Sequence, residues 1–205
     1  MAAPRKRSTR PSTRQQTKEQ TRARLIEAGL RLFAERGLDG PSLDAICERA
    51  GFTRGAFYVH FRDRDDFLVH AIGEAGGALI ERLVGDDTRD LPTATARLMT
   101  AIADGSYPLV PGGGVPFHLL VDACMRSPKL RARYVELIAE SVERLRGLLR
   151  RGKKDGLVSD AIDARATATL LMATLLGVQT MLELGAPIEL PKLISATLAL
   201  VGRAR

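Results

Sequence analysis

The sequence is poor in the residue patterns that catalytic and metal sites require. Its three histidines, His60, His70 and His118, show no metal-ligand spacing. The glycines at 112–114 stand between prolines, without the Lys-Ser/Thr that ends a phosphate-binding loop. Neither a His-Glu-x-x-His nor a Gly-x-Ser-x-Gly motif occurs. We therefore expect neither an enzyme nor a bound metal or cofactor.

Cysteine and long apolar segments are also scarce. The two cysteines, Cys47 and Cys124, lie far apart in apolar helical patterns, which predicts reduced core residues of a cytoplasmic protein. The first 24 residues contain no apolar segment of the kind found in a signal peptide. The charge-free stretch 166–182 has only 17 positions and includes four threonines, so we expect a buried helix there and no membrane span.

Positive charge is what the chain has in excess, and it is concentrated at the N-terminus. The formal net charge is +7 at pH 7. Residues 1–16 hold five bases and no acid, whereas residues 17–67 hold nine of each. A segment so rich in Ser, Thr, Pro and charge cannot form a core, so residues 1–16 are predicted to be a disordered basic tail. The tail either strengthens DNA binding through phosphate contacts or is a leader without a specific role.

The most informative stretch is 42–61, SLDAICERAGFTRGAFYVHF. Its first half carries an apolar stripe at i, i+3, i+4 and i+7, formed by Leu43, Ile46, Cys47 and Ala50. Ser42 is placed to cap this helix and Gly51 to end it. Thr53 then caps a second helix that runs to about Phe61. Two helices joined by a short glycine turn form a helix-turn-helix unit, whose second helix enters the DNA major groove.

The flanking segments also have helical patterns. Thr17 and Gln20 form a capping-box pattern that opens a helix ending at Arg36. Further helices are expected at about 64–84, 92–105, 116–126, 127–151, 160–184 and 189–203. We therefore predict an all-α protein. An N-terminal three-helix DNA-binding domain over 17–78, with its helix-turn-helix motif at 42–61, precedes a helical ligand-binding and dimerisation domain over 79–205.

The order of residues from Leu25 to Leu68 resembles the TetR family of bacterial repressors. The matching segments are Ala28–Gly37, Ser42–Ile46 and Gly55–Phe61. The resemblance implies a homodimeric repressor that a small-molecule ligand releases from a palindromic DNA operator. Because one unit of this size reads few bases, a dimer is expected to bind two half-sites roughly 34–36 Å apart. The alternatives are an activator, a DNA-binding protein without an effector, and a ligand carrier with a vestigial DNA-binding domain.

The second helix of the motif supplies most of the candidate DNA contacts. If Phe57 and Phe61 face the core, the residues left for DNA are Thr53, Arg54, Gly55, Ala56, Tyr58 and His60. Arg54 can donate two hydrogen bonds to guanine O6 and N7. The resemblance adds Arg64, Thr17 and Ser42 as phosphate contacts. Ser42 and Thr53 can instead be caps alone, and Tyr58 can be partly a core residue.

Residues 164–184 are apolar on nearly every side, so this helix needs partners on more than one face. One seam packs on its own domain and the other on a second subunit. The resemblance implies a dimer interface built by the last two helices. We assign to it the seam of Ala168, Leu171, Leu175, Val178 and Leu182, together with Leu198 of the final helix. The second surface holds Leu170, Ala173, Leu176 and Met181.

The candidate ligand contacts are the few polar or aromatic residues among aliphatic segments, namely Tyr107, Phe117, His118, Asp122, Cys124 and Gln179. His118 and Asp122 share a helix face at i, i+4, so they can bond to each other or to a ligand. The identity of the small-molecule effector does not follow from the sequence. Gly73, Gly76 and Gly77 weaken the helix at 64–84, either as a hinge or for close packing.

Overall fold

The computed structural model describes residues 13–103 and 115–202, and within these ranges every regular element is an α-helix. The first four helices are α1 (Thr13–Arg36), α2 (Leu43–Ala50), α3 (Arg54–Tyr58) and α4 (Arg64–Val84). They are followed by α5 (Leu91–Ala103), α6 (Phe117–Arg126), α7 (Pro128–Lys154), α8 (Ala164–Glu183) and α9 (Leu190–Val201). The all-α prediction is confirmed. Tyr107 lies outside the described residues.

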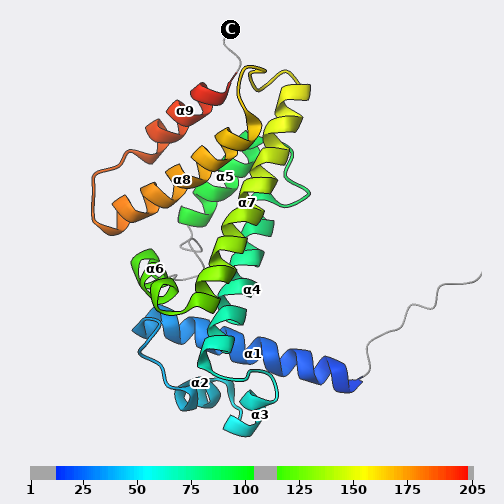
Figure 1. Cartoon of the computed structure of the whole chain (residues 1–205), viewed down its shortest axis with the longest axis vertical. Coiled ribbons are helices and arrows are strands. Elements are labelled where there is room, and N and C mark those ends of the chain that lie inside the picture. The colour runs from blue at the N-terminus through cyan, green and yellow to red at the C-terminus, as the bar shows by residue number, and fades with distance from the viewer. Residues whose placement is uncertain (1–12, 104–114, 203–205) are drawn as a thin grey trace, which may run out of the picture.

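Two long helices connect the two ends of the molecule (Figure 1). α4 and α7 pack along each other, with α1, α2 and α3 gathered at one end and α5, α8 and α9 toward the other. α6 lies between the two groups, close to α1, and packs on both α7 and α8. The expected DNA-binding unit therefore forms one end of the molecule, and α4 leads directly from it into the remainder.

The local signals around the helix-turn-helix motif fold as the sequence predicts. The Ser42 hydroxyl accepts the Ala45 N–H at 3.1 Å, and the Thr53 hydroxyl accepts the Ala56 N–H at 3.3 Å. Gly51 ends α2 with φ 75°, in the left-handed region that favours glycine. α3 is shorter than expected, because regular helix ends at Tyr58 and a turn carries the chain on to Phe61.

Two helix starts differ from the prediction. α1 begins at Thr13, so Thr17 is inside the helix and its expected role as the cap is wrong. The helix-favouring residues 14–16 extend α1 into what was expected to be tail. α8 begins at Ala164 and not near Asp160, and it is capped by Asp163. Before that point a backbone bond from Ser159 to Val201 holds the chain against the end of α9.

The core has two parts. The lower part centres on a buried group of phenylalanines, in which Phe57 lies 5.2 Å from Phe61 and 5.4 Å from Phe67 between ring centroids. Phe33 joins it, and the same cluster continues into α6 and α7 through Leu120, Ala123, Cys124, Leu130 and Leu137. The upper part holds Leu91, Ala94, Leu148, Leu149, Val158, Ala168 and Val201.

The glycines of α4 differ from one another in their surroundings. A Cβ at Gly76 would lie 2.6 Å from the Leu137 Cδ1 atom, and one at Gly73 would lie 2.9 Å from the Arg133 Nε atom. A Cβ at Gly77 would meet nothing within 4 Å. Gly73 and Gly76 therefore allow α4 and α7 to approach closely, which favours the packing interpretation at these two positions.

A matched pair of alanine substitutions separates these roles. Gly77→Ala should stabilise the protein by up to about 1 kcal/mol, because alanine favours helix and has room there. Gly76→Ala should cost about 1–3 kcal/mol, because Leu137 must move within a packed core. Urea unfolding of both variants measures the difference. Equal effects of the two substitutions would contradict the packing role of Gly76.

Candidate DNA-binding surface and ligand cavity

The recognition helix α3 divides cleanly into an inner and an outer face. Phe57 is fully buried, whereas Tyr58 beside it is 52% exposed. The other candidate DNA contacts divide in the same way. Thr53, Arg54 and Gly55 are exposed, and Ala56 and His60 are half-buried. The structure therefore brings together on one outer surface most of the residues that the sequence assigns to DNA.

Arg54 is held by a residue that sequence reasoning missed. Its Nε atom lies 2.5 Å from the Asp44 Oδ1 atom, in the first turn of α2. An ion pair through Nε leaves the two terminal amino groups of the guanidinium, which are the groups that bind guanine O6 and N7. Asp44 and Arg54 are ten positions apart, and only the fold of the two short helices brings them together.

Arg64 does not present its side chain as expected. Its guanidinium donates to the Leu38 carbonyl and is half-buried, which ties the start of α4 to the segment after α1. The expectation of a phosphate contact rested on the family resemblance and on the charge of Arg64, and it could not include this carbonyl. Arg62, two residues earlier, is exposed.

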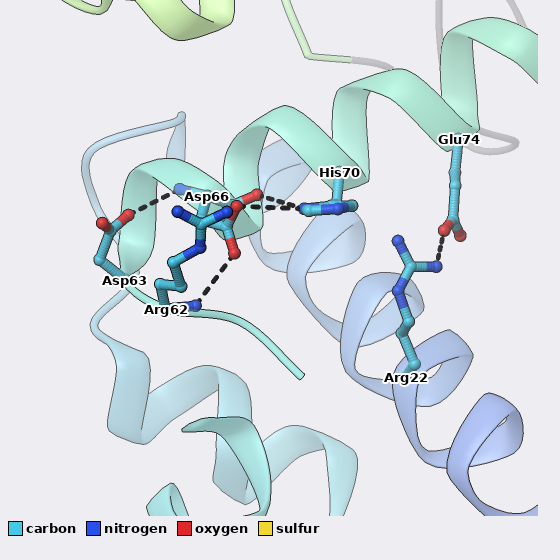
Figure 2. Close-up of polar contacts among 6 residues, drawn as sticks. All are labelled: Arg22, Arg62, Asp63, Asp66, His70 and Glu74. Atoms are coloured by element: carbon cyan, nitrogen blue, oxygen red, sulfur yellow. Dashed lines mark hydrogen bonds and ion pairs between the residues drawn. The ribbon is translucent and has the colours of Figure 1, made fainter. Parts of the chain in front are cut away.

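Polar contacts fix the start of α4 against the DNA-binding unit (Figure 2). The Asp63 carboxylate accepts the Asp66 N–H at 2.7 Å, and the Asp66 carboxylate accepts the Arg62 N–H at 3.0 Å. Further along, Arg22 of α1 forms an ion pair with Glu74 of α4. The orientation of α4 is thus coupled to that of α1.

His60 faces the protein more than the solvent. Burial, together with the nearby Lys18 and Arg22, lowers the pKa of its imidazole. Its Nδ1 atom is buried and has no hydrogen-bond partner among the described residues. Because the imidazole of His60 is neutral and its Nδ1 atom is buried, only the Nε2 side of the ring is left to contact DNA.

A cavity of about 250 Å³ lies among the six helices α4 to α9. Two of the predicted ligand residues, Phe117 and Gln179, line it. Sequence reasoning missed five further lining residues with polar side-chain atoms, because nothing in the local pattern distinguishes them. They are Thr95, Tyr134, Ser141, Thr174 and Thr197. Among the described residues no group of three His, Cys, Asp or Glu side chains is arranged to hold a metal ion.

The other predicted ligand residues lie elsewhere. His118 pairs with Glu183 at 3.0 Å and Asp122 pairs with Arg126 at 2.9 Å, so the first of the two alternatives, a bond between His118 and Asp122, is wrong. His118 and Asp122 therefore each pair with another side chain, Glu183 and Arg126 respectively, and not with one another. Cys124 is buried in the lower core and does not line the cavity.

Glu183 links the end of α8 to the start of α6. Its carboxylate accepts hydrogen bonds from the backbone N–H groups of Phe117 and His118 and from the side chain of Gln179. The side chain is only 19% exposed. Burial alone would raise the pKa of Glu183, but these hydrogen bonds lower it by more than burial raises it. The pKa therefore lies below its usual value, and the carboxyl remains ionised. Two of its partners, Phe117 and Gln179, also line the cavity.

The two seams of α8 are oriented opposite to the prediction. Leu171, Leu175 and Val178 line the cavity, as does Leu198 of α9, and Ala168 is buried in the upper core. Leu182, the last member of the predicted seam, is partly exposed. Most of the second surface faces outward instead, where Leu170 is 61% and Met181 49% exposed, whereas its Leu176 also lines the cavity. Both seams are apolar, so periodicity alone could not show which one points inward.

The expectation that α8 is a buried helix is also wrong for the single chain. Only Ala168 and Gln179 are buried in it. By length and composition α8 could cross a membrane, a test that core helices also pass. Its inner side packs on α7 and encloses the cavity. The outer side leaves Leu170, Met181 and Leu184 uncovered, and Leu200 of α9 is exposed as well.

A helix-turn-helix unit joined by one long helix to a helical domain that encloses an apolar cavity defines a ligand-responsive DNA-binding regulator. Residues 25–71 match the family "Bacterial regulatory proteins, tetR family". Residues 94–196 match the family "Tetracyclin repressor-like, C-terminal domain". The chain belongs to the tetR family. It is a transcriptional repressor whose binding to DNA responds to a ligand.

Individual relatives agree with this assignment. The Bacillus subtilis (strain 168) fatty acid metabolism regulator protein is 23% identical over 151 residues, which cover 74% of this chain and 77% of that protein. Escherichia coli NemR in its reduced form superposes with a TM-score of 0.73 at 20% identity, covering 91% of this chain and 98% of NemR. Bacillus subtilis FadR with stearoyl-CoA superposes with a TM-score of 0.62 at 21% identity, covering 87% and 96%.

Proposed function

We propose that the protein binds a palindromic operator as a homodimer in the cytoplasm and leaves it when a small molecule fills the cavity. The observation that carries this proposal is the uncovered apolar surface of α8 and α9, formed by Leu170, Met181, Leu184 and Leu200. Uncovered apolar side chains of this kind mark an interaction site. A second copy is its natural partner, because a two-fold axis places the same surface opposite itself.

The two-fold symmetry of such a dimer also explains how the protein can recognise a specific DNA sequence. One recognition helix contacts only a few bases, whereas a two-fold dimer presents two helices to half-sites one helical turn apart. We assign base reading to Arg54. Thr53, Gly55, Ala56, Tyr58 and His60 are assigned to the surrounding groove and backbone, and Ser42 and Thr17 to phosphates.

The effector acts through differential affinity. For ligand to release DNA, it must bind the released state more tightly than the DNA-bound state, by the same free energy that the operator loses. The cavity borders both α4, which continues from the DNA-binding unit, and the α6 end held by Glu183. A ligand there touches the elements that position the recognition helices.

The assignment of base reading is tested by Arg54→Ala. Operators are first selected from a random duplex pool with the parent protein, and the enriched site should be a palindrome. Arg54→Ala should weaken binding to the selected operator by about 1–3 kcal/mol and relax the base preference at one position of each half-site. Arg150→Ala, an exposed base on α7 far from α3, is the control of equal charge. An unchanged ratio of operator to random-DNA affinity would show that Arg54 does not read a base.

A further inference from the structure

Within residues 13–103 and 115–202, the cavity wall contains no charged side chain. Among the described residues that line it there is no Asp, Glu, Lys, Arg or His. The wall is built mainly from Leu, Ile, Val, Met and Ala of six helices, and its aromatic members are Phe117 and Tyr134. Burial raises the pKa of Tyr134 to about 12, so its hydroxyl is neutral at physiological pH. The cavity is therefore an electrically neutral and predominantly aliphatic enclosure.

Half of the polar side chains in the wall are already bonded within the protein. The Ser141 hydroxyl donates to the Leu137 carbonyl at 2.8 Å, and the Thr197 hydroxyl donates to the Leu193 carbonyl at 2.8 Å. The Gln179 amide donates to Glu183. The hydroxyls of Thr95, Thr174 and Tyr134 remain as groups that can bond to a ligand. The wall thus offers a few neutral hydrogen bonds and no ion pair.

These two properties decide which ligands the cavity can hold. A charge moved from water into an apolar enclosure is strongly disfavoured unless a counter-charge or several hydrogen bonds receive it. A cation has no acid there, and two aromatic rings are too few to enclose it. A carboxylate or phosphate has no base there. An apolar chain, in contrast, gains affinity by about fourfold for each methylene that it buries.

We propose that the effector is an uncharged molecule with a flexible aliphatic body and one hydrogen-bonding group, such as a medium-chain alcohol or ester. A volume of about 250 Å³ is below the usual range for drug-sized ligands, which favours a short chain. The FadR relative was crystallised with stearoyl-CoA, a large anionic thioester. The ligand class assigned to this chain differs in charge and in size. The inference rests on the proposed function only in taking this cavity as the effector site.

Ligands with one chain and different head groups test the inference. N-phenyl-1-naphthylamine, a neutral fluorescent probe, reports occupation of the cavity. Decan-1-ol, methyl decanoate, decanoate, decyltrimethylammonium and decanoyl-CoA then compete with it below their micelle concentrations. Decan-1-ol and methyl decanoate should displace the probe at concentrations at least tenfold lower than the three charged compounds. The inference is overturned if decanoate, decanoyl-CoA or decyltrimethylammonium binds as tightly as the two neutral compounds or more tightly. It is also overturned if neither neutral compound displaces the probe or raises the melting temperature of the protein.

Leu175 of α8 and Leu184, the residue that directly follows this helix, provide a matched pair that locates the binding. Leu175 lines the cavity, whereas Leu184 is 80% exposed. Leu175→Ala should shift the preferred alcohol from decan-1-ol toward dodecan-1-ol, and Leu184→Ala should not. Thr174→Val keeps the side-chain shape and should weaken the alcohol more than the ester if Thr174 accepts the alcohol's proton. A chain-length preference that none of the three variants changes would overturn the assignment to this cavity.

Operator binding is measured separately with the same compounds. If decan-1-ol binds the cavity and dissociates the operator complex, both the ligand class and the proposed release are supported. If it binds without dissociating the complex, the ligand class stands and ligand-driven release by this class fails. Because the probe experiment contains no DNA, the two proposals can fail independently.

Discussion

Met181→Glu is expected to convert the protein into monomers and to abolish tight operator binding. Met181 is 49% exposed on the outer surface of α8, in line with Leu170 and Leu184, and Ala173 and Gly177 lie between them. Small residues in the middle of the stripe let two α8 helices approach each other. A glutamate on this stripe places two like charges in a desolvated interface, because the two-fold axis duplicates every substitution.

The expected loss is large because two linked half-sites bind cooperatively. Linking two DNA-binding units in one dimer raises the affinity for the operator by roughly 10²–10⁴ over that of one unit, and a monomer loses this factor. Light scattering measures the mass, and a titration with operator DNA measures the affinity. Val135→Glu, an exposed position on α7, is the control, and it should remain dimeric. Leu175→Glu should perturb the cavity instead. A Met181→Glu protein that stays dimeric would place the interface on another surface.

Phe57→Ala should unfold the DNA-binding end of the molecule at much lower urea concentrations. Phe57 is fully buried, and its ring contacts those of Phe61 and Phe67. Truncating a buried phenylalanine costs about 3–5 kcal/mol, because apolar contacts are lost and a void remains. Domains of this size are stabilised by about 5–15 kcal/mol in total, so the variant should retain only part of its stability.

Tyr58→Ala is the matched control, because it removes an aromatic ring from the next position on the exposed face. Its unfolding free energy should change by less than about 1 kcal/mol, while its affinity for DNA should fall. Urea unfolding and operator titration of both variants separate the two effects. If Tyr58→Ala destabilises the protein as much as Phe57→Ala does, Tyr58 is a core residue and the division of α3 into two faces is incorrect.

The sequence predicts this fold where the determining interactions are local. Ser42, Gly51 and Thr53 set the ends of α2 and α3 through bonds to residues three or four positions away, so the pattern alone locates the helix-turn-helix. The burial of Phe57 and Phe61 follows from helical periodicity in the same way. The starts of α1 and α8 were misplaced because several residues can begin a helix, and tertiary contacts select among them.

The sites were predicted less well, because their partners lie far apart in the chain. Glu183 is bonded to residues more than sixty positions away, and the sequence gives no sign of this contact. The resemblance predicts a phosphate contact for Arg64, whereas its carbonyl partner at Leu38 becomes evident only in three dimensions. For α8, two apolar seams of similar quality leave the inward direction undetermined until α7 and α9 are placed.

The two parts of the core do not coincide with the division of the chain near residue 78. Leu120, Leu130 and Leu137, which follow that point, complete the same interior as the phenylalanines of the DNA-binding unit. A fragment ending at residue 78 would lose the packing that supports α4. The cavity borders both cores, since its lining includes Leu120 and Leu137 of the lower part and Leu91 and Ala94 of the upper part. A molecule that fills it becomes a shared packing partner of the two cores, and tightly packed interiors transmit a change of shape over their whole extent.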